Sequence, residues 1–235
     1  MKPLHGTLHL LLAAGLVVLL GCGSQHALRP FNGDTLSGWT TKDGPGQNRW
    51  TVGTPVVDPN DPKMLLAEPG GHCLINLARH HGDSLDLYSR ARFGNARIEL
   101  EVMVPKDSNS GIYVMGEYEV QVLDSWGHKE LNNGDMGAVY GASPPPVNAS
   151  RPPGEWQKYV IIWQAPRFDA AGKKIANAVF RNIELNGVVL HENLEMPGPT
   201  PGGITGKEAP TGPLMFQGNH GPVAYRNIRI VPLKF

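Results

Sequence analysis

The chain has 235 residues, in which 21 lysine and arginine side chains balance 21 aspartate and glutamate side chains. This balance gives no electrostatic case for binding nucleic acid, which usually needs a basic surface. The 29 glycines and 21 prolines favour many turns over long helices, and 40% hydrophobic residues are enough to build the core of one large β domain.

The N-terminus has the pattern of a secretion signal. Lys2 gives it a positive start, and residues 8–20 are almost wholly apolar but too few for a comfortable membrane span. Residues 19–22, Leu-Leu-Gly-Cys, resemble a bacterial lipobox, a signal in which the cysteine becomes lipid-modified. The alternative is an ordinary secretory signal with a chance cysteine.

The lipobox predicts a signal peptide over residues 1–21, a tether over residues 22–28 and a lipid anchor on Cys22. Gly23 stands where an inner-membrane retention signal has aspartate, which favours the outer membrane or periplasmic face of a bacterial cell envelope. With Cys22 acylated, Cys73 is the remaining thiol, and no internal disulfide can form. Its apolar neighbours indicate a buried structural cysteine.

Runs of apolar residues predict strands through the middle of the chain. Residues 97–104 alternate, with isoleucine, leucine and valines on one side and charged residues mostly on the other. Residues 156–163 show little alternation, which predicts a strand covered on both faces. Asn-Gly at 186–187, between apolar runs at 178–185 and 188–190, predicts a tight hairpin because both residues tolerate positive φ.

Between these runs lies the most informative segment, residues 108–125, which we interpret as one strand. Successive side chains of a strand point to opposite faces. One face then carries apolar side chains that suit a core, namely Ile112, Val114, Tyr118, Val120 and Val122. The other carries Tyr113, Met115, Glu117, Glu119 and Gln121. This second face is a plausible floor for a sugar-binding groove, and the alternative is a solvated outer face.

The C-terminal part predicts a last pair of strands, at residues 214–217 and 223–231, joined by a loop that carries His220. The proline- and glycine-rich stretches at 143–154 and 196–212 predict long surface loops, since proline cannot donate to a strand ladder. No segment shows helical periodicity. The fold expected is all-β, a sandwich of two antiparallel sheets packed face to face.

Ordered blocks along the chain resemble one large bacterial family. The blocks are Phe31–Asp34 with Gly38–Trp39, Asp86–Ser89 with Phe93–Gly94, Ser108–Ser125, Gly137–Gly141, Gly154–Gln157 with Ala165–Phe168, Asn186–Val188 with His191, Gly198–Thr200, and Gly212–Gln217 with His220 and Arg226–Ile228. The chain resembles the 3-keto-disaccharide hydrolase family, formerly a domain of unknown function. The resemblance implies a concanavalin A-like jelly roll over residues 29–235, with carbohydrate on a concave face.

The resemblance departs from the family pattern near the C-terminus. Residues 216–223 read Phe-Gln-Gly-Asn-His-Gly-Pro-Val, where the family has a pattern closer to Leu-Gln-Asp-His-Gly-Asn-Pro-Val. Glycine replaces the usual acidic residue, and an extra residue precedes His220. The loop around His220 is therefore expected to differ in geometry.

The chemistry implied by the family is cleavage of 3-keto-glycosides. A ketone at C3 acidifies the hydrogen on C2, so a base can form an enolate, the anomeric group can leave, and water can add back. A separate sugar 3-dehydrogenase would have to supply the keto-sugar. Two other classes stay open: a non-catalytic carbohydrate-binding lipoprotein and a structural surface protein with a vestigial groove.

Glu119 is the predicted base, with its pKa raised by the neighbouring carboxylate of Glu117, and His220 is the second predicted acid–base residue. The predicted substrate-binding residues are Glu117, Gln121, Glu101, Asn109, Trp126, Tyr140, Gln217 and Arg226.

Several of these residues have two readings. Glu101 is expected on an adjacent strand, facing the same groove. Arg226 could hold an oxyanion or pair with a carboxylate. Trp126 and Tyr140 could stack on a sugar ring or cap the core. Clustered Glu, Gln and Asn oxygens could also hold a divalent cation.

Overall fold

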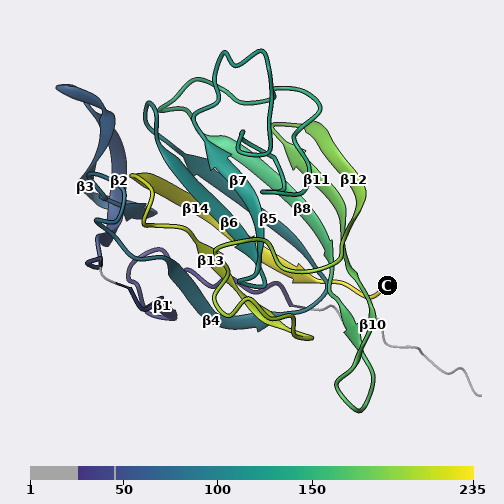
Figure 1. Ribbon diagram of the computed structural model, residues 1–235. Coiled ribbons are helices and arrows are strands. Elements are labelled where there is room, and N and C mark those ends of the chain that lie inside the picture. Colours follow the sequence, from purple (N-terminus) through teal and green to yellow (C-terminus); the bar gives the residue numbers. More distant parts are fainter. Residues whose placement is uncertain (1–25, 45) are drawn as a thin grey trace, which may run out of the picture.

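The computed structural model describes residues 26–44 and 46–235. Within those residues the chain forms strands and turns and no helix, so no helix that could span a membrane is found there. The strands form two large sheets and one two-stranded ribbon (Figure 1). The predicted all-β jelly roll of two antiparallel sheets is confirmed. The predicted signal peptide and Cys22 lie outside the described residues.

The smaller of the two large sheets has five antiparallel strands. In spatial order they are β1 (Trp39–Thr41), β4 (Leu87–Phe93), β13 (Gly212–Phe216), β6 (Asn109–Val114) and β7 (Tyr118–Leu123).

The larger sheet has seven antiparallel strands. In spatial order they are β12 (Val188–Met196), β11 (Ala178–Leu185), β8 (Gln157–Gln164), β5 (Ala96–Met103), β14 (Val223–Pro232), β3 (Asp61–Asn76) and β2 (Trp50–Asp58). The ribbon consists of β9 (Arg167–Phe168) and β10 (Lys174–Ala176). Ahead of β1, Leu28 already exchanges two backbone hydrogen bonds with Ile230 of β14, so ordered pairing begins inside the segment expected to be a tether.

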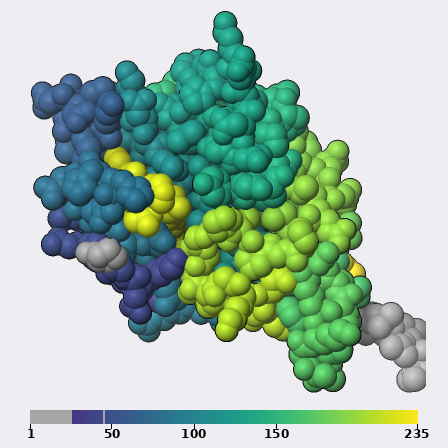
Figure 2. All heavy atoms as spheres, in the orientation of Figure 1, coloured from purple at the N-terminus to yellow at the C-terminus, as the bar shows by residue number. Residues whose placement is uncertain are grey.

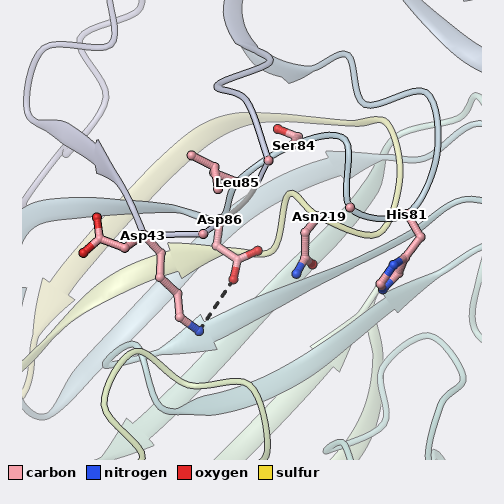
Figure 3. A pocket seen from close by; sticks show the side chains of 10 residues that line it. Asp43, His81, Ser84, Leu85, Asp86 and Asn219 are labelled. Carbon is pink, nitrogen blue, oxygen red and sulfur yellow. Dashed lines mark ion pairs between the residues drawn. The ribbon is translucent and has the colours of Figure 1, made fainter.

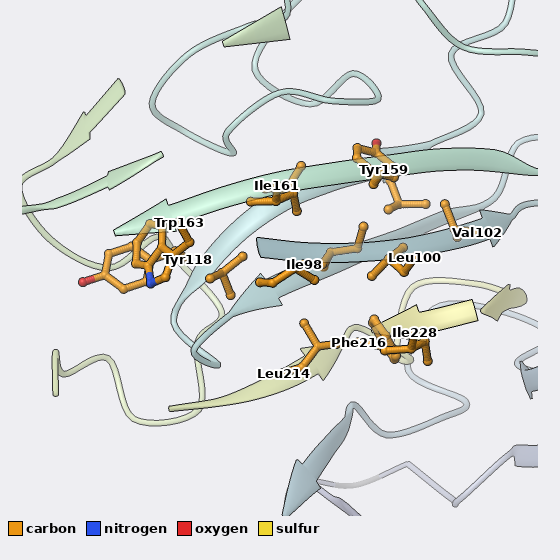
Figure 4. Close-up of a cluster of buried hydrophobic side chains, with 14 of the residues drawn as sticks. Ile98, Leu100, Val102, Tyr118, Tyr159, Ile161, Trp163, Leu214, Phe216 and Ile228 are labelled. Atoms are coloured by element: carbon orange, nitrogen blue, oxygen red, sulfur yellow. The ribbon is translucent and has the colours of Figure 1, made fainter. Parts of the chain in front are cut away.

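The core fills the space between the two sheets. Figure 4 shows side chains of β5 and β8 facing those of β13 across this space. Ile98, Leu100 and Val102 of β5 are all buried there, as their alternation predicts. Aromatic rings add close contacts, including Phe216 of β13 stacked on Tyr225 of β14 with ring centroids 3.8 Å apart. Burial of this apolar surface is what holds the two sheets together.

The expectation of one continuous strand over the glutamate-rich segment is wrong. Met115 and Gly116 have φ angles of 53° and 74°, and they turn the chain between β6 and β7. Val114 pairs with Tyr118, so three residues form the turn and the alternation continues in phase across it. For this reason the predicted core face is correct on both strands, although Met115 packs into the core instead of facing outward.

Other local predictions are confirmed. Asn186 and Gly187 have φ angles of 54° and 87° and join β11 to β12, which extends beyond its predicted end to Met196. Cys73 is a buried free thiol, and burial raises its pKa. The long loop before β13 is present between Met196 and Gly212.

Candidate functional site

The outer face of the five-stranded sheet, here called the groove face, carries a row of side chains that crosses all five strands. Directly paired residues of antiparallel strands point to the same face. The pairings run from Thr40 through Tyr88, Met215 and Tyr113 to Glu119. The base predicted from the sequence therefore lies at one end of a row that points away from the core.

A second row lies beside the first on the same face. Backbone hydrogen bonds join Lys42 to Asp86 (2.8 Å) and Gln217 to Gly111 (3.0 Å), and Gly111 pairs with Gln121. The two rows bring polar side chains from both ends of the chain onto one surface. Only the tertiary pairing of β4, β13 and β6 places them together.

A cavity of about 220 Å³, here called the Glu119 pocket, lies over these rows. It is lined by Asn109, Tyr113, Glu119, Gln121, Tyr140, Pro201, Gly202, Gln217 and His220. Figure 2 shows the segments that supply this lining: the teal loops after β7, the yellow-green loop before β13 and the yellow segment after β13 lie against one another. Six of the residues predicted from the sequence meet here: Glu119, His220, Asn109, Gln121, Tyr140 and Gln217.

Glu119 is only 2% exposed, and no cation pairs with it among the described residues. Burial raises the pKa of its carboxyl to about 7, and the negative charge of Asp86 adds to the rise. The hydroxyl of Tyr113 donates to Oε2 of Glu119 at 2.8 Å, which opposes the rise by favouring the ionised form. A pKa near neutrality is what a general base needs at physiological pH. The cause predicted from the sequence, the neighbouring Glu117, is wrong.

Gly111 provides the space for this carboxyl group. A Cβ atom at Gly111 would collide with Oε1 of Glu119. The side chain of Glu119 thus lies across the backbone of the neighbouring strand, where a larger residue would displace it.

Two amide oxygens in the pocket lining are buried and have no hydrogen-bond partner among the described residues, Oε1 of Gln121 and Oε1 of Gln217. Their amide nitrogens are engaged at 3.4 Å, with Oδ1 of Asn109 and with the Tyr113 hydroxyl. A buried acceptor without a partner is costly. Hydroxyl groups of a bound ligand would satisfy both oxygens, which is the chemistry expected of a carbohydrate site.

His220 lines the same pocket. Its Nδ1 contacts Oδ1 of Asn219, and its ring packs edge-on against His81 with centroids 4.5 Å apart. Burial lowers the pKa of His220, and His81 lowers it further, while Asp86 opposes both. The lowered pKa favours the neutral imidazole, in which Nδ1 donates its proton to Oδ1 of Asn219 and Nε2 can accept one.

Glu117 does not face the Glu119 pocket, contrary to the sequence-based expectation. It belongs to the turn between β6 and β7, and its carboxylate accepts hydrogen bonds from the backbone and hydroxyl of Thr205 and the backbone of Gly206. It lines a separate cavity of about 290 Å³, here called the Glu117 cavity, together with Arg92 and Lys207. Its acceptor capacity is used mainly to hold the loop before β13.

Glu101 and Arg226 lie on the seven-stranded sheet, so the expectation that Glu101 faces the groove is wrong. Arg226 on β14 pairs across the strands with Glu101 on β5, and its Nε donates to Oε2 of Glu101 at 2.6 Å. Its guanidinium also lies over the ring of Trp156 at 4.0 Å. Of the two predicted roles of Arg226, holding an oxyanion or pairing with a carboxylate, the structure shows the pairing with a carboxylate.

The two predicted stacking residues differ in position. Tyr140 lines the Glu119 pocket and is 39% exposed. Trp126 is 55% exposed and does not line this pocket. The interpretation that Trp126 caps the core is therefore wrong, and its stacking on a sugar ring stays a prediction.

No group of three or more His, Cys, Asp or Glu side chains is placed to hold a metal ion in the described part of the chain. The divalent cation therefore also stays a prediction.

Sequence reasoning missed two residues of this surface. Tyr113 was placed on the groove face but not assigned to the site, because its contact with Glu119 depends on the hairpin between β6 and β7. Asp86 carries a buried carboxylate whose Oδ1 accepts a hydrogen bond from the backbone of Gly218 at 2.9 Å. A Cβ at Gly218 would collide with Leu85, so the glycine that departs from the family pattern leaves no room for an acidic side chain there.

Comparisons with known proteins concern the family and the fold of the chain. Residues 27–231 match the model of the 3-keto-alpha-glucoside-1,2-lyase-like domain. A 3-keto-disaccharide hydrolase of Bacteroides thetaiotaomicron is 27% identical over 161 residues, which cover 56% of this chain and 50% of that protein. The chain thus spans about half the length of this curated relative.

Two solved structures share the fold, and both are described as putative glycosyl hydrolases of Parabacteroides distasonis. The first is 30% identical, with a TM-score of 0.67 and coverage of 88% of this chain and 84% of that one. The second is 18% identical, with a TM-score of 0.58 and coverage of 88% and 94%.

Proposed function

Because the chain belongs to the family of 3-keto-alpha-glucoside-1,2-lyase-like domains, we propose that it cleaves 3-keto-glycosides, with Glu119 as the base that removes the proton from C2. The observation that carries the proposal is the carboxyl of Glu119, which is buried in a polar pocket and has a pKa of about 7. A base with this pKa is ionised in a large fraction of molecules at neutral pH.

The proposed reaction runs by elimination followed by hydration. Glu119 takes the C2 proton, the electron pair enters the C3 carbonyl to form an enolate, and its return expels the anomeric group. Water then adds across the resulting double bond to give the free 3-keto sugar. A conventional glycosidase instead needs two carboxylates flanking the bond. Glu119 is the only carboxylate among the residues that line its pocket, and Asp86, which lines the adjoining cavity, is paired with Lys42.

Other residues of the pocket can take the remaining roles. The amide nitrogen of Gln217 keeps a second N–H beside its contact with the Tyr113 hydroxyl and can stabilise the enolate oxygen, while Tyr113 holds Glu119 in place. Nε2 of the neutral His220 can accept a proton from the attacking water, and the proton that Glu119 takes from C2 can pass to the leaving oxygen. The unpartnered oxygens of Gln121 and Gln217 can accept hydrogen bonds from sugar hydroxyls.

A pair of substrates tests this function. The full-length chain carrying Cys22→Ser, which cannot be acylated, is offered a 3-keto-glucoside and the corresponding ordinary glucoside. We expect release of the aglycone from the keto substrate alone, and in deuterated water we expect deuterium at C2 of the product. Equal cleavage of both substrates, or product without deuterium at C2, would contradict elimination. Sugar binding by calorimetry without turnover of any keto-sugar would favour the carbohydrate-binding alternative.

The cell envelope is the proposed location, with the chain anchored by a lipid on Cys22 and supplied by a separate sugar 3-dehydrogenase. The lipobox at residues 19–22 supports this proposal. Metabolic labelling with an alkyne fatty acid should mark the wild-type chain in the membrane fraction and leave Cys22→Ser unlabelled. Equal labelling of both would exclude Cys22 as the acylated residue.

A further inference from the structure

A second cavity opens next to the Glu119 pocket. It has a volume of about 240 Å³, and its lining includes Lys42, His81, Asp86 and Asn219. We call it the Lys42 cavity. Figure 3 shows the side chains of His81, Asp86 and Asn219 directed into the same space, with the ion pair between Lys42 and Asp86 at 3.8 Å.

The two cavities adjoin at both ends. At one end the rings of His81, from the Lys42 cavity, and His220, from the Glu119 pocket, are in edge-on contact. At the other end the ammonium group of Lys42 donates to the carbonyl of Gly202, which lines the Glu119 pocket, at 2.8 Å. Asp86 between them is near enough for its charge to raise the pKa of Glu119.

The volumes indicate that one ligand extends through both spaces. Binding sites for small molecules usually measure about 300–1,000 Å³. Neither cavity reaches that range alone, at about 220 and 240 Å³, whereas the two together fall within it. A molecule with one ring over Glu119 and a second part beyond His220 fits this shape.

The lining of the Lys42 cavity matches hydroxyl groups. The side chain of Asp86 is buried, and within the described part of the chain its Oδ2 has only the 3.8 Å contact with Lys42, so it can still accept a hydrogen bond. Nδ2 of Asn219 has no partner among the described residues and can donate. The Glu117 cavity differs, because its carboxylate already accepts three hydrogen bonds. The Gly202–Gly203 segment, which accepts hydrogen bonds from Lys42, lies between Tyr113 of the Glu119 pocket and Glu117.

We propose that the Lys42 cavity is the subsite that binds the leaving group of the substrate, which is the second ring of a 3-keto-disaccharide, the substrate class that the name of the Bacteroides relative gives. The inference rests on the proposed function, because it assumes that the keto ring lies over Glu119. The bond to be broken then lies at the boundary between the cavities, beside His220. This position lets Nε2 of His220 accept a proton from the water that replaces the departing group.

A crystal structure of Glu119→Gln with an uncleaved 3-keto-disaccharide tests the placement directly. We expect the keto ring over residue 119 and the second ring in contact with Lys42, His81 or Asn219. A second ring in the Glu117 cavity or in open solvent would overturn the inference while leaving the proposed function intact. A keto ring bound away from residue 119 would overturn both.

Kinetics give an independent test with a matched control. His81→Ala removes a side chain that lines the Lys42 cavity, whereas His72→Ala removes an exposed histidine that contacts Gly33 and Asp34 and lines neither the Lys42 cavity nor the Glu119 pocket. For a 3-keto-disaccharide we expect His81→Ala to raise KM about three- to tenfold, the size of one lost hydrogen bond. For methyl 3-keto-glucoside we expect no change in KM, and for His72→Ala no change with either substrate.

The two substrates separate a direct contact from an effect through His220. If His81→Ala lowers kcat equally for both substrates and leaves both KM values unchanged, His81 acts on His220 alone and the inference is wrong. If neither variant cleaves either substrate and the wild type is also inert, the proposed function itself has failed.

Discussion

The strands of both outer faces of the sandwich carry glutamates, but the surroundings of these carboxylates differ between the two faces. On the seven-stranded sheet, Glu99 accepts a hydrogen bond from Nε of Arg97 at 2.6 Å, and this contact lowers its pKa. On the groove face, Glu119 is buried and has no cationic partner in the described structure, and its pKa rises to about 7. One face neutralises its carboxylates with arginine, and the other leaves a carboxylate able to bind a proton.

The difference shows that alternation of side chains alone does not identify a reactive residue. Glu99, Glu101 and Glu119 all occur in alternating strand segments. What separates them is whether a guanidinium group lies within contact distance and whether a loop covers the side chain. The following variants test this contrast.

Replacing Glu119 should have the largest effect. We expect Glu119→Gln to reduce kcat by roughly 10²–10⁴-fold, the usual contribution of a general base. The same change should stabilise the fold at high pH. Glu119 is protonated in both the folded and unfolded states below its unfolded pKa of 4.5, so it costs nothing there. Between pH 4.5 and about 7 Glu119 ionises in the unfolded state but not in the folded state, so the free energy of unfolding falls as pH rises. Above about pH 7 both states are ionised and the loss of stability stays constant.

At pH 8 the penalty is about 3 kcal/mol, from a shift of between two and three pKa units. Thermal unfolding at pH 5 and pH 8 checks the sign: the variant should gain melting temperature relative to the wild type at pH 8 and little at pH 5. An equal gain at both pH values would mean that the pKa of Glu119 is not raised.

Gly111→Ala should disturb the site without removing any of its functional groups. Its Cβ would collide with Oε1 of Glu119 and displace the carboxyl group. A displacement of about 1 Å can reduce kcat roughly 10²-fold. Gly198→Ala is the control, because a Cβ there meets nothing within 4 Å and the backbone is not left-handed. Similar activity of the two variants would show that Gly111 does not position the base.

Tyr113→Phe should have a smaller effect and a distinct pH signature. The variant loses the hydrogen bond that opposes the rise in the pKa of Glu119, so the pKa should rise further. The acid limb of the pH profile of kcat/KM should move to higher pH, and the rate at pH 7 should fall about tenfold. Tyr118→Phe is the control, since its hydroxyl donates to Glu208 outside the pocket. An unshifted acid limb in Tyr113→Phe would show that the hydrogen bond from Tyr113 does not affect the pKa of Glu119.

The smallest effect is expected on the outer face of the seven-stranded sheet. The double variant Glu101→Gln and Arg226→Met removes a partly exposed ion pair, which contributes no more than about 1 kcal/mol to stability. We expect kcat and KM for the keto substrate to stay at their wild-type values. A loss of activity comparable to that of Gly111→Ala would show that Glu101 or Arg226 contributes to the functional site.

Local patterns predicted the strands well where their signals were continuous. The sequence predicted three features correctly: the alternation of β5, the Asn-Gly turn between β11 and β12, and the core face of the β6–β7 hairpin. The turn at Met115 and Gly116 was missed because a three-residue turn keeps the alternation in phase. The strands β1 to β4 were not predicted.

Residue types and periodicity along a strand were enough to predict the all-β class, the family and the outward-facing position of Glu119. The order of the strands in the two sheets depends on tertiary contacts. These contacts place Glu101 on the opposite sheet, bring Gln217 beside Gly111 and Asp86 near enough to raise the pKa of Glu119, and cover Glu119 with the loop before β13. A pKa depends on the distance to charges and on burial, and both are set by contacts between residues far apart in the chain.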